Sequence, residues 1–195
     1  MDAMELEQIL CEADRKILLT LARHTIQQIA AGQRLPRLNL ADYSEDLQRD
    51  GASFVTLTID EQLRGCIGAL EAYQPLVLDV QEHAAAAASE DYRFRPVRPE
   101  EVPLLQIEIS RLTPTQPLLY EDWHDLIDQL RPGLDGVLIR DGVRRATFLP
   151  QVWEKLPDPR NFLDHLCVKM GAPSDYWRIH KLDVSIYQVE EFKEE

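Results

Sequence analysis

The chain has 195 residues, of which 34 are Asp or Glu and 21 are Lys or Arg, so its formal net charge at pH 7 is −13. This charge has the wrong sign for long-range attraction to a nucleic-acid backbone or an anionic membrane, and both partners are therefore disfavoured. A hydrophobic content of 45% is typical of a globular protein, and the length suffices for one core or for two unequal subdomains that share a cleft.

The cysteines are odd in number and scattered, at Cys11, Cys66 and Cys167, which does not fit a disulfide framework. The N-terminal stretch MDAMELEQIL carries acidic residues where a secretory signal would carry basic ones. No segment is long and apolar enough to cross a bilayer. These features predict a reduced, cytoplasmic protein.

The first predicted element is a helix from Asp14 to Ala31, where apolar residues recur at helical spacing and Gly32 offers a left-handed C-terminal stop. Residues 33–50 have mixed polarity and no sustained period, which predicts a loop with a short turn. We expect this segment to run over the surface.

A β-hairpin is predicted next. Residues 52–59 are rich in β-branched and aromatic side chains, and a polar turn at 60–62 leads to a second strand over 63–70. Pro75 then begins an Ala-rich helix that ends near Ser89, and its small side chains would let another backbone come close.

The link over residues 90–103 contains three prolines, so it is predicted to be an extended connector without regular hydrogen-bond ladders. A strand over 104–112 follows, with Gln106, Glu108 and Ser110 on one face and an apolar face turned inward.

In the second half of the chain, a helix is predicted over 122–130 that buries Trp123, Ile127 and Leu130. A hairpin is predicted over 136–149, and its two-residue turn is Asp141-Gly142. The remaining elements are a short helix from Pro150, a helix from Asp158 that Gly171 ends, and a final strand over 182–189. Because hairpins and helices are interspersed without regular βαβ units, the predicted fold class is α/β of the α+β type, with mostly antiparallel sheets.

The stretch LRGCIG at residues 63–68 is unusual for a strand, because Gly65 and Gly68 supply no side chain to pack. With a strand period of two, Arg64 and Cys66 share one face, and Leu63, Gly65 and Ile67 share the other. We expect the glycines to make room for a molecule that lies against the backbone.

Several side chains are candidates for chemistry near this stretch. Cys66 could act as a nucleophile whose thiolate Arg64 stabilises, although a small buried hydrophobe is the commoner role of a free cysteine. His83 could be its base, or a hydrogen-bonded core residue. Glu108 could pair with Arg64, or remain a solvated carboxylate.

A cluster of positive charge lies in the connector. Arg93, Arg95 and Arg98 alternate there and could hold a phosphate or carboxylate, or could pair with the surplus acids of the protein. No metal or cofactor is predicted, because His165 and Cys167 do not face the same way on a helix and no CxxC, HExxH, GxGxxG or Walker pattern occurs.

LRGCIG resembles the signature of the AMMECR family, whose bacterial members are called AmmeMemoRadiSam system protein A. TFLPQVW at 147–153, FLDHLCVKMG at 162–171 and Trp177 match the order and spacing of the family, so the resemblance covers nearly the whole chain, as a single AMMECR domain. It implies two unequal subdomains with the signature lining the cleft between them. It implies no particular reaction, and Trp153, Phe162 and Trp177 are most simply core anchors.

Two functions are therefore predicted. The first is a small-molecule site, as an enzyme or enzyme component that takes a small anionic substrate or ligand in the cleft. The second is an adaptor or regulatory subunit that binds a Memo-like or radical S-adenosylmethionine partner protein, as the system name of the family suggests. The predicted catalytic residues are Cys66, Arg64, His83 and Glu108, and the predicted ligand-binding residues are Leu63, Gly65, Ile67, Gly68 and Arg93.

Overall fold

The computed structural model describes residues 9–194, and these divide into two compact units. Unit 1 comprises the described residues up to Thr113 together with those from Glu190, and unit 2 comprises Pro114–Val189. Each unit has its own sheet, helices and hydrophobic core. The α+β class predicted from the sequence is confirmed, because most strands pair with antiparallel neighbours.

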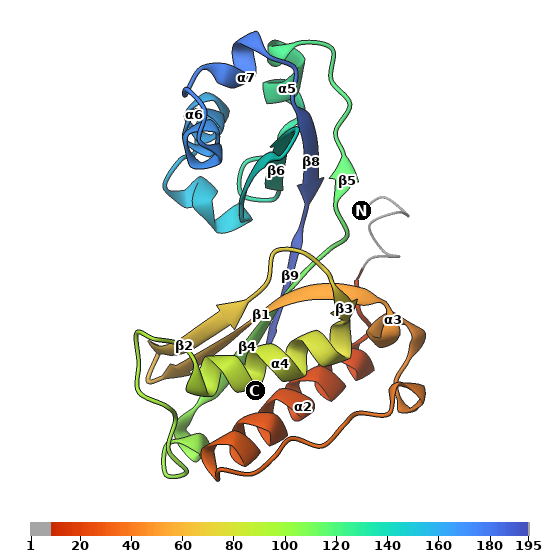
Figure 1. Ribbon diagram of the computed structural model, residues 1–195, viewed down its shortest axis with the longest axis vertical. Coiled ribbons are helices and arrows are strands. Elements are labelled where there is room, and N and C mark those ends of the chain that lie inside the picture. Colours follow the sequence, from red (N-terminus) through yellow and green to blue (C-terminus); the bar gives the residue numbers. More distant parts are fainter. Residues whose placement is uncertain (1–8, 195) are drawn as a thin grey trace. The chain divides into compact units, whose positions relative to one another are not determined.

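Unit 1 is built on a five-stranded sheet in the order β2-β1-β4-β9, with β3 paired to β1 (Figure 1). Helices α2 and α4 cover one face of this sheet, and the opposite side is called the outer face below. The strands are β1 (Asp50–Ile59), β2 (Gln62–Gly68), β3 (Gln74–Pro75), β4 (Gln106–Leu112) and β9 (Val189–Lys193). The helices are α2 (Glu12–Ala30), η1 (Leu40–Asp42), α3 (Glu45–Gln48), α4 (Leu76–Ser89) and η2 (Val102–Leu104).

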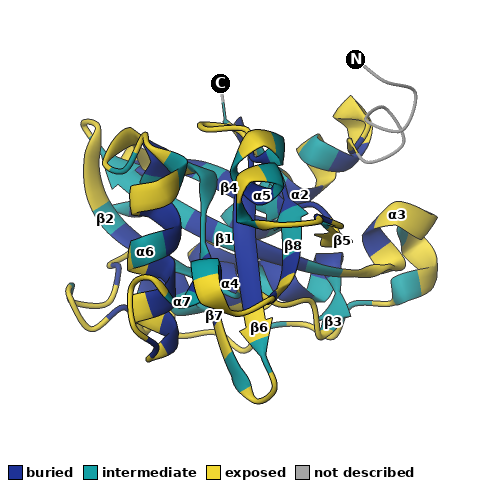
Figure 2. Ribbon diagram, turned by 90° about the horizontal axis from the view of Figure 1, so that it is seen from above, coloured by how far each residue is buried: buried dark blue, intermediate teal, exposed yellow. Residues whose placement is uncertain are grey.

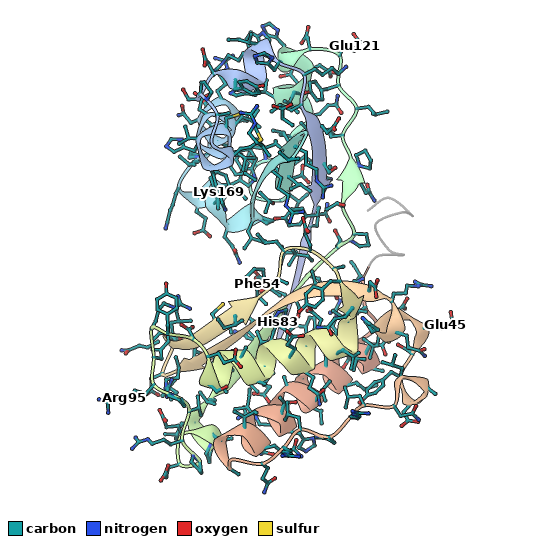
Figure 3. The ribbon with its side chains drawn as sticks, in the orientation of Figure 1. Glu45, Phe54, His83, Arg95, Glu121 and Lys169 are labelled. Atoms are coloured by element: carbon teal, nitrogen blue, oxygen red, sulfur yellow. The ribbon has the colours of Figure 1, made fainter. Side chains whose placement is uncertain are left out.

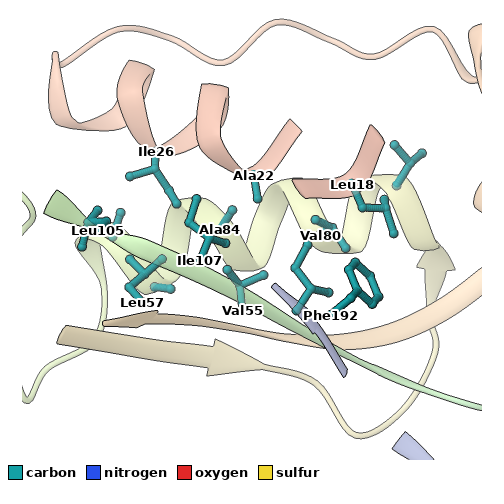
Figure 4. Packing of buried hydrophobic residues seen from close by; sticks show 14 of the residues in the cluster. Leu18, Ala22, Ile26, Val55, Leu57, Val80, Ala84, Leu105, Ile107 and Phe192 are labelled. Atoms are coloured by element: carbon teal, nitrogen blue, oxygen red, sulfur yellow. The ribbon is translucent and has the colours of Figure 1, made fainter. Parts of the chain in front are cut away.

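The core of unit 1 forms where α2 and α4 pack on the strands. Leu18, Ala22 and Ile26 of α2 meet α4, and Val55 and Leu57 of β1 point to the same core (Figure 4). All five are fully buried. The helical period of α2 and the alternation of β1, both visible in the sequence, therefore place apolar side chains where the tertiary fold needs them.

Unit 2 has a four-stranded sheet in the order β5-β8-β6-β7. Its strands are β5 (Gln116–Pro117), β6 (Gly136–Asp141), β7 (Arg144–Phe148) and β8 (Asp183–Tyr187), and its helices are α5 (Trp123–Gln129), η3 (Pro150–Glu154), α6 (Pro159–Met170) and α7 (Tyr176–Ile179). The predicted anchors Trp153, Phe162 and Trp177 are buried in its core, and Trp153 stacks on Phe162 with 3.7 Å between ring centroids. Figure 2 shows the buried side of α6 in dark blue.

Three predictions about local structure need correction. The loop of the β6–β7 hairpin is Gly142-Val143 and not Asp141-Gly142, because Asp141 pairs with Arg144 and the positive φ of 59° falls on the first loop residue. The second correction concerns α5, in which Trp123 and Ile127 were predicted to be buried. Both are partly exposed, and Leu126 is the fully buried residue of the helix.

The third correction concerns the end of the chain. The strand predicted over 182–189 is two strands that belong to different sheets, β8 in unit 2 and β9 in unit 1. The sequence VEEFK of β9 lacks an apolar alternation, but Glu190 lies between Arg15 of α2 and Arg111 of β4, at 2.7 and 3.2 Å. Ion pairs with arginines far away in the sequence thus allow an acidic segment to join the sheet.

We predict that Gly65→Ala destabilises the protein by about 1–3 kcal/mol, because an added methyl group would meet the carbonyl oxygen of Ala87 in α4 at 2.3 Å. Urea denaturation of the purified protein measures this change. Leu63→Ala in the same strand is the control, since the Leu63 side chain is exposed and its removal should cost much less. Equal stability of Gly65→Ala and wild type would contradict the close packing of α4 on β2.

Candidate functional site

The register of β2 decides where the side chains of LRGCIG point. Cys66 lies opposite Thr56 of β1, and Gly65 lies opposite Leu57, but Thr58 is opposite Leu63. One step along β1 therefore corresponds to two steps along β2, which makes Arg64 the extra residue of a β-bulge. The bulge moves Leu63 to the same face as Thr58 and Cys66, and corrects the prediction that Leu63, Gly65 and Ile67 share a face.

The two glycines of the motif have packing roles. A Cβ atom at Gly65 would lie 2.3 Å from the carbonyl oxygen of Ala87, so the strand can approach the backbone of α4 only with glycine there. A Cβ atom at Gly68 would lie 2.4 Å from the ring of Phe54. The room that the sequence suggested for a ligand is thus filled by the protein's own helix and by an aromatic ring.

A row of three polar side chains crosses the outer face of the sheet. Residues directly opposite one another on neighbouring strands share a face, and Thr56 is opposite Cys66 on one side and Glu108 on the other. The hydroxyl of Thr56 donates to the sulfur of Cys66 at 3.3 Å. Within the described part of the chain Glu108 has no hydrogen-bond or ion-pair partner, and all three side chains are partly exposed.

The backbone of Cys66 is held from the other side by the connector that follows α4. Its N–H donates to Asp91 Oδ2 at 2.9 Å, and its carbonyl accepts from Arg93 Nη2 at 3.2 Å. Asp91 and Arg93 also bind each other through two side-chain hydrogen bonds of 2.6 and 2.8 Å. The Arg93 guanidinium holds the pKa of the Asp91 carboxyl well below its usual range, and the N–H of Cys66 contributes in the same direction.

Arg64 is paired with a carboxylate of the connector, and this carboxylate is Glu101. Arg64 Nε and Nη2 donate to the two oxygens of Glu101 at 2.9 and 3.2 Å. Both side chains are less than one-fifth exposed. The predicted pairing with Glu108 is therefore wrong, because that residue lies on the far side of β1 and Glu101 already occupies the guanidinium.

His83 lies on α4, on the opposite side of the sheet from the Cys66 thiol, so it cannot serve as the base of this thiol in this fold (Figure 3). Its Nδ1 is 3.2 Å from Asp79 Oδ2, which also accepts from the hydroxyl of Ser53 at 2.6 Å. Ser53 and Asp79 are fully buried and His83 nearly so. The alternative role of a hydrogen-bonded core histidine is the one that the structure shows.

The remaining predicted residues are spread over several environments. Ile67 packs against the core of unit 1, and Leu63 is 43% exposed. Leu63 and Arg64 line a hollow of about 190 Å³ at the tip of the β1–β2 hairpin, together with Ile59, Asp60 and Gln62. In the connector, Arg98 lies 3.5 Å from Glu101 and Arg95 is exposed.

Sequence reasoning missed Thr56, Asp91 and Glu101. Thr56 carried a weak signal, because strand alternation places it on the polar face of β1. The two acids carried none, since the connector has no period from which their directions could be read. Only the return of the connector along β2 brings them to Cys66 and Arg64.

The other cysteines differ from Cys66 in their environments. Cys11 is exposed, and its sulfur accepts from the N–H of Asp14 as the N-cap of α2, at 3.4 Å. Cys167 is fully buried, and burial raises the pKa of its thiol. Among residues 9–194 no three His, Cys, Asp or Glu side chains form a group that could hold a metal, and no helix there is long and apolar enough to cross a membrane.

The two units define an α+β protein in which an edge strand presents a thiol on the outer face of an antiparallel sheet. The chain belongs to the AMMECR1 family, whose model matches residues 19–192, and this confirms the family predicted from LRGCIG. A protein of Methanothermobacter thermautotrophicus is 37% identical over 183 residues, covering 92% of this chain and 94% of that protein. A protein of Methanocaldococcus jannaschii is 33% identical and covers 89% and 86%. The crystal structure of an uncharacterized protein from Pyrococcus horikoshii superposes with a TM-score of 0.76 at 30% identity, covering 95% of this chain and 94% of that one.

The Arg64–Glu101 pair predicts a pH dependence of stability. The Arg64 guanidinium, and then the N–H of Arg98, lower the pKa of Glu101 from its ordinary value of 4.5 to about 2. Because the folded-state pKa is the lower one, the stabilisation is complete above about pH 4.5 and is lost as the pH falls toward 2. Glu101→Gln should therefore cost roughly 2 kcal/mol at pH 7, and this difference from wild type should shrink below pH 4.5.

Urea denaturation at pH 7, 4.5 and 3.5 measures this difference. Glu100→Gln is the matched control, because Glu100 is exposed and has no ion-pair partner among residues 9–194. A Glu101→Gln cost that is as large at pH 3.5 as at pH 7 would show that the carboxylate charge is not its source.

Proposed function

We propose that this AMMECR1-family protein binds a small ligand on the outer face of the sheet in unit 1 and acts on it through the thiol of Cys66, as an enzyme or an enzyme component. The observation that carries the proposal is the hydrogen bond from Thr56 to the sulfur of Cys66, at 3.3 Å on a partly exposed face. This hydrogen bond fixes the sulfur in place on a face that a small ligand can reach, and sulfur is an intrinsically strong nucleophile. In such a reaction the sulfur forms a bond to an electrophilic carbon, a leaving group departs with its electron pair, and the thiol proton passes to solvent.

The row of polar side chains limits the size of the ligand. Neighbouring strands lie about 4.8 Å apart, so the backbones of Cys66 and Glu108, which are separated by β1, lie roughly 10 Å apart. A ligand of a few non-hydrogen atoms could span this distance over Thr56. Its electrophilic end would meet the thiol, and a hydrogen-bond donor at the other end would meet the carboxylate of Glu108.

The sequence suggested that this ligand is anionic and is held by Arg64 and Arg93. The ion pairs of these residues do not favour that part of the prediction, because Glu101 and Asp91 neutralise the guanidinium groups. An anion would have to displace Glu101 from Arg64 before it could bind. The proposal therefore rests on the thiol and not on a positive pocket.

Alkylation of the native protein with iodoacetamide tests the proposal, with mass spectrometry following each cysteine separately. We expect Cys66 to react faster than Cys11, although Cys11 is the more exposed thiol, and Cys167 to react slowest because it is fully buried. Thr56→Val should lower the rate of Cys66 to that of an ordinary thiol. Thr58→Val is the matched control on the same face of β1, and should leave the rate unchanged.

A wild-type Cys66 that reacts no faster than Cys11 would contradict the proposed function. So would an unchanged rate in Thr56→Val, since the supporting observation would then have no effect on the thiol.

The adaptor role is the second candidate, and exposed apolar side chains favour it. Tyr92 in the connector is 95% exposed, and Leu104, the last residue of η2, is 64% exposed. Exposed aromatic residues are frequent anchors of protein–protein interfaces. Under this proposal the partner is a Memo-like or radical S-adenosylmethionine protein, and a cytoplasmic location is part of the same prediction.

Copurification from cells at native expression tests the adaptor role. Tyr92→Ala should reduce recovery of such a partner at least severalfold, whereas Val143→Ala, which removes an equally exposed side chain in unit 2, should not. Failure of the wild-type protein to retain either partner would argue against this role.

A further inference from the structure

We infer that Asp91 and Arg93 are positioning residues for the Cys66 thiol, an inference that rests on the proposed function of this thiol. The sequence assigned Arg93 to an incoming ligand and gave no role to Asp91. Instead, both side chains bind the backbone of Cys66, whose sulfur accepts the hydrogen bond from Thr56.

The Cys66 side chain needs positioning residues because of its place in the sheet. β2 is a terminal strand in the order β2-β1-β4-β9, and the bulge at Arg64 interrupts its register two residues before Cys66. An edge strand beside a bulge has unpaired backbone groups and opens readily. Without further contacts, the sulfur of Cys66 would not be kept within reach of the Thr56 hydroxyl.

Asp91 and Arg93 supply the contacts that a neighbouring strand would otherwise make. Asp91 accepts the N–H of Cys66 and Arg93 donates to its carbonyl, so both edge-facing backbone groups of this residue are satisfied. Asp91 itself is only 4% exposed, and it also accepts the backbone N–H of Arg93 at 3.2 Å. The buried carboxylate thus ties the Arg93 guanidinium, whose side chain is 43% exposed, to the strand.

Helix α4 sets the position of Asp91 and Arg93, which are together called the clamp below. Asp91 follows the last residue of the helix by two positions, and the helix is seated on β2 through its contact with Gly65. Residues 65 and 66 are therefore held by the same part of the chain, Gly65 by the helix and Cys66 by the segment directly after it. A movement of α4 would change both contacts.

The test uses the full-length protein and two measurements on Asp91→Asn, Arg93→Gln and Arg93→Lys, with circular dichroism to establish that each variant is folded. The first measurement is amide hydrogen exchange at Cys66, which should accelerate about tenfold when one hydrogen bond of the clamp is lost. The second is the iodoacetamide rate of Cys66 relative to that of Cys11 in the same molecule. This ratio should fall in Asp91→Asn and Arg93→Gln and be partly restored in Arg93→Lys, which keeps the charge and a donor.

A purely structural role would not lower the rate ratio, because a loosened strand exposes the thiol and would leave the ratio unchanged or raise it. Glu101→Gln is the matched control, since it breaks a neighbouring contact between connector and strand at the Arg64 side chain and should leave the ratio unaltered. A fast wild-type Cys66 that stays fast in Asp91→Asn and Arg93→Gln overturns the positioning role alone. A wild-type Cys66 no faster than Cys11 overturns the proposed function, and the positioning role with it.

Discussion

The close approach of α4 to β2 at Gly65 is the contact on which the arrangement of unit 1 depends. The carbonyl oxygen of Ala87 lies 2.3 Å from where a Cβ atom of residue 65 would be, a distance that only glycine permits. The contact also requires the small alanines of the helix. Because successive strand residues point to opposite faces, seating Gly65 against α4 turns the side chain of Cys66 to the outer face.

The course of the connector follows from the same contact. Since α4 ends beside β2, the segment after it returns along the edge of this strand, where Asp91 meets the Cys66 backbone and Glu101 meets the Arg64 side chain. The guanidinium groups of Arg64, Arg93 and Arg98 are thereby paired with nearby carboxylates. β9 shows the same use of charge, with Glu190 held by arginines of α2 and β4. In a chain with a net charge of −13, positive side chains tie segments of the fold together.

Most of the LRGCIG motif therefore serves the fold. Gly65 admits the helix, Gly68 lies under the ring of Phe54, Ile67 packs into the core, and Arg64 binds the connector. Cys66 differs from these residues, because its backbone N–H and carbonyl both bind the connector while its sulfur faces the outer side of the sheet beside Thr56. A rigidly held backbone and an accessible thiol are the combination that thiol chemistry requires.

Elements whose signals are local could be predicted from the sequence. The period of α2, the Asp158 cap and Gly171 stop of α6, the two hairpins and the motif that identifies the family all lie within short windows of the chain. The partners of the functional side chains could not be predicted, because they depend on how distant segments pack. The bulge at Arg64 shifts the register by one residue, and a shift of one residue exchanges the faces of a strand, which no alternation count can foresee. The sheet separates His83 from Cys66, and strand β1 separates Glu108 from Arg64, whereas Asp91 and Glu101 reach Cys66 and Arg64 from a connector without any period. The physical reason is that hydrogen bonds and ion pairs act between atoms close in space, and for these residues that closeness exists only once α4 has packed on β2.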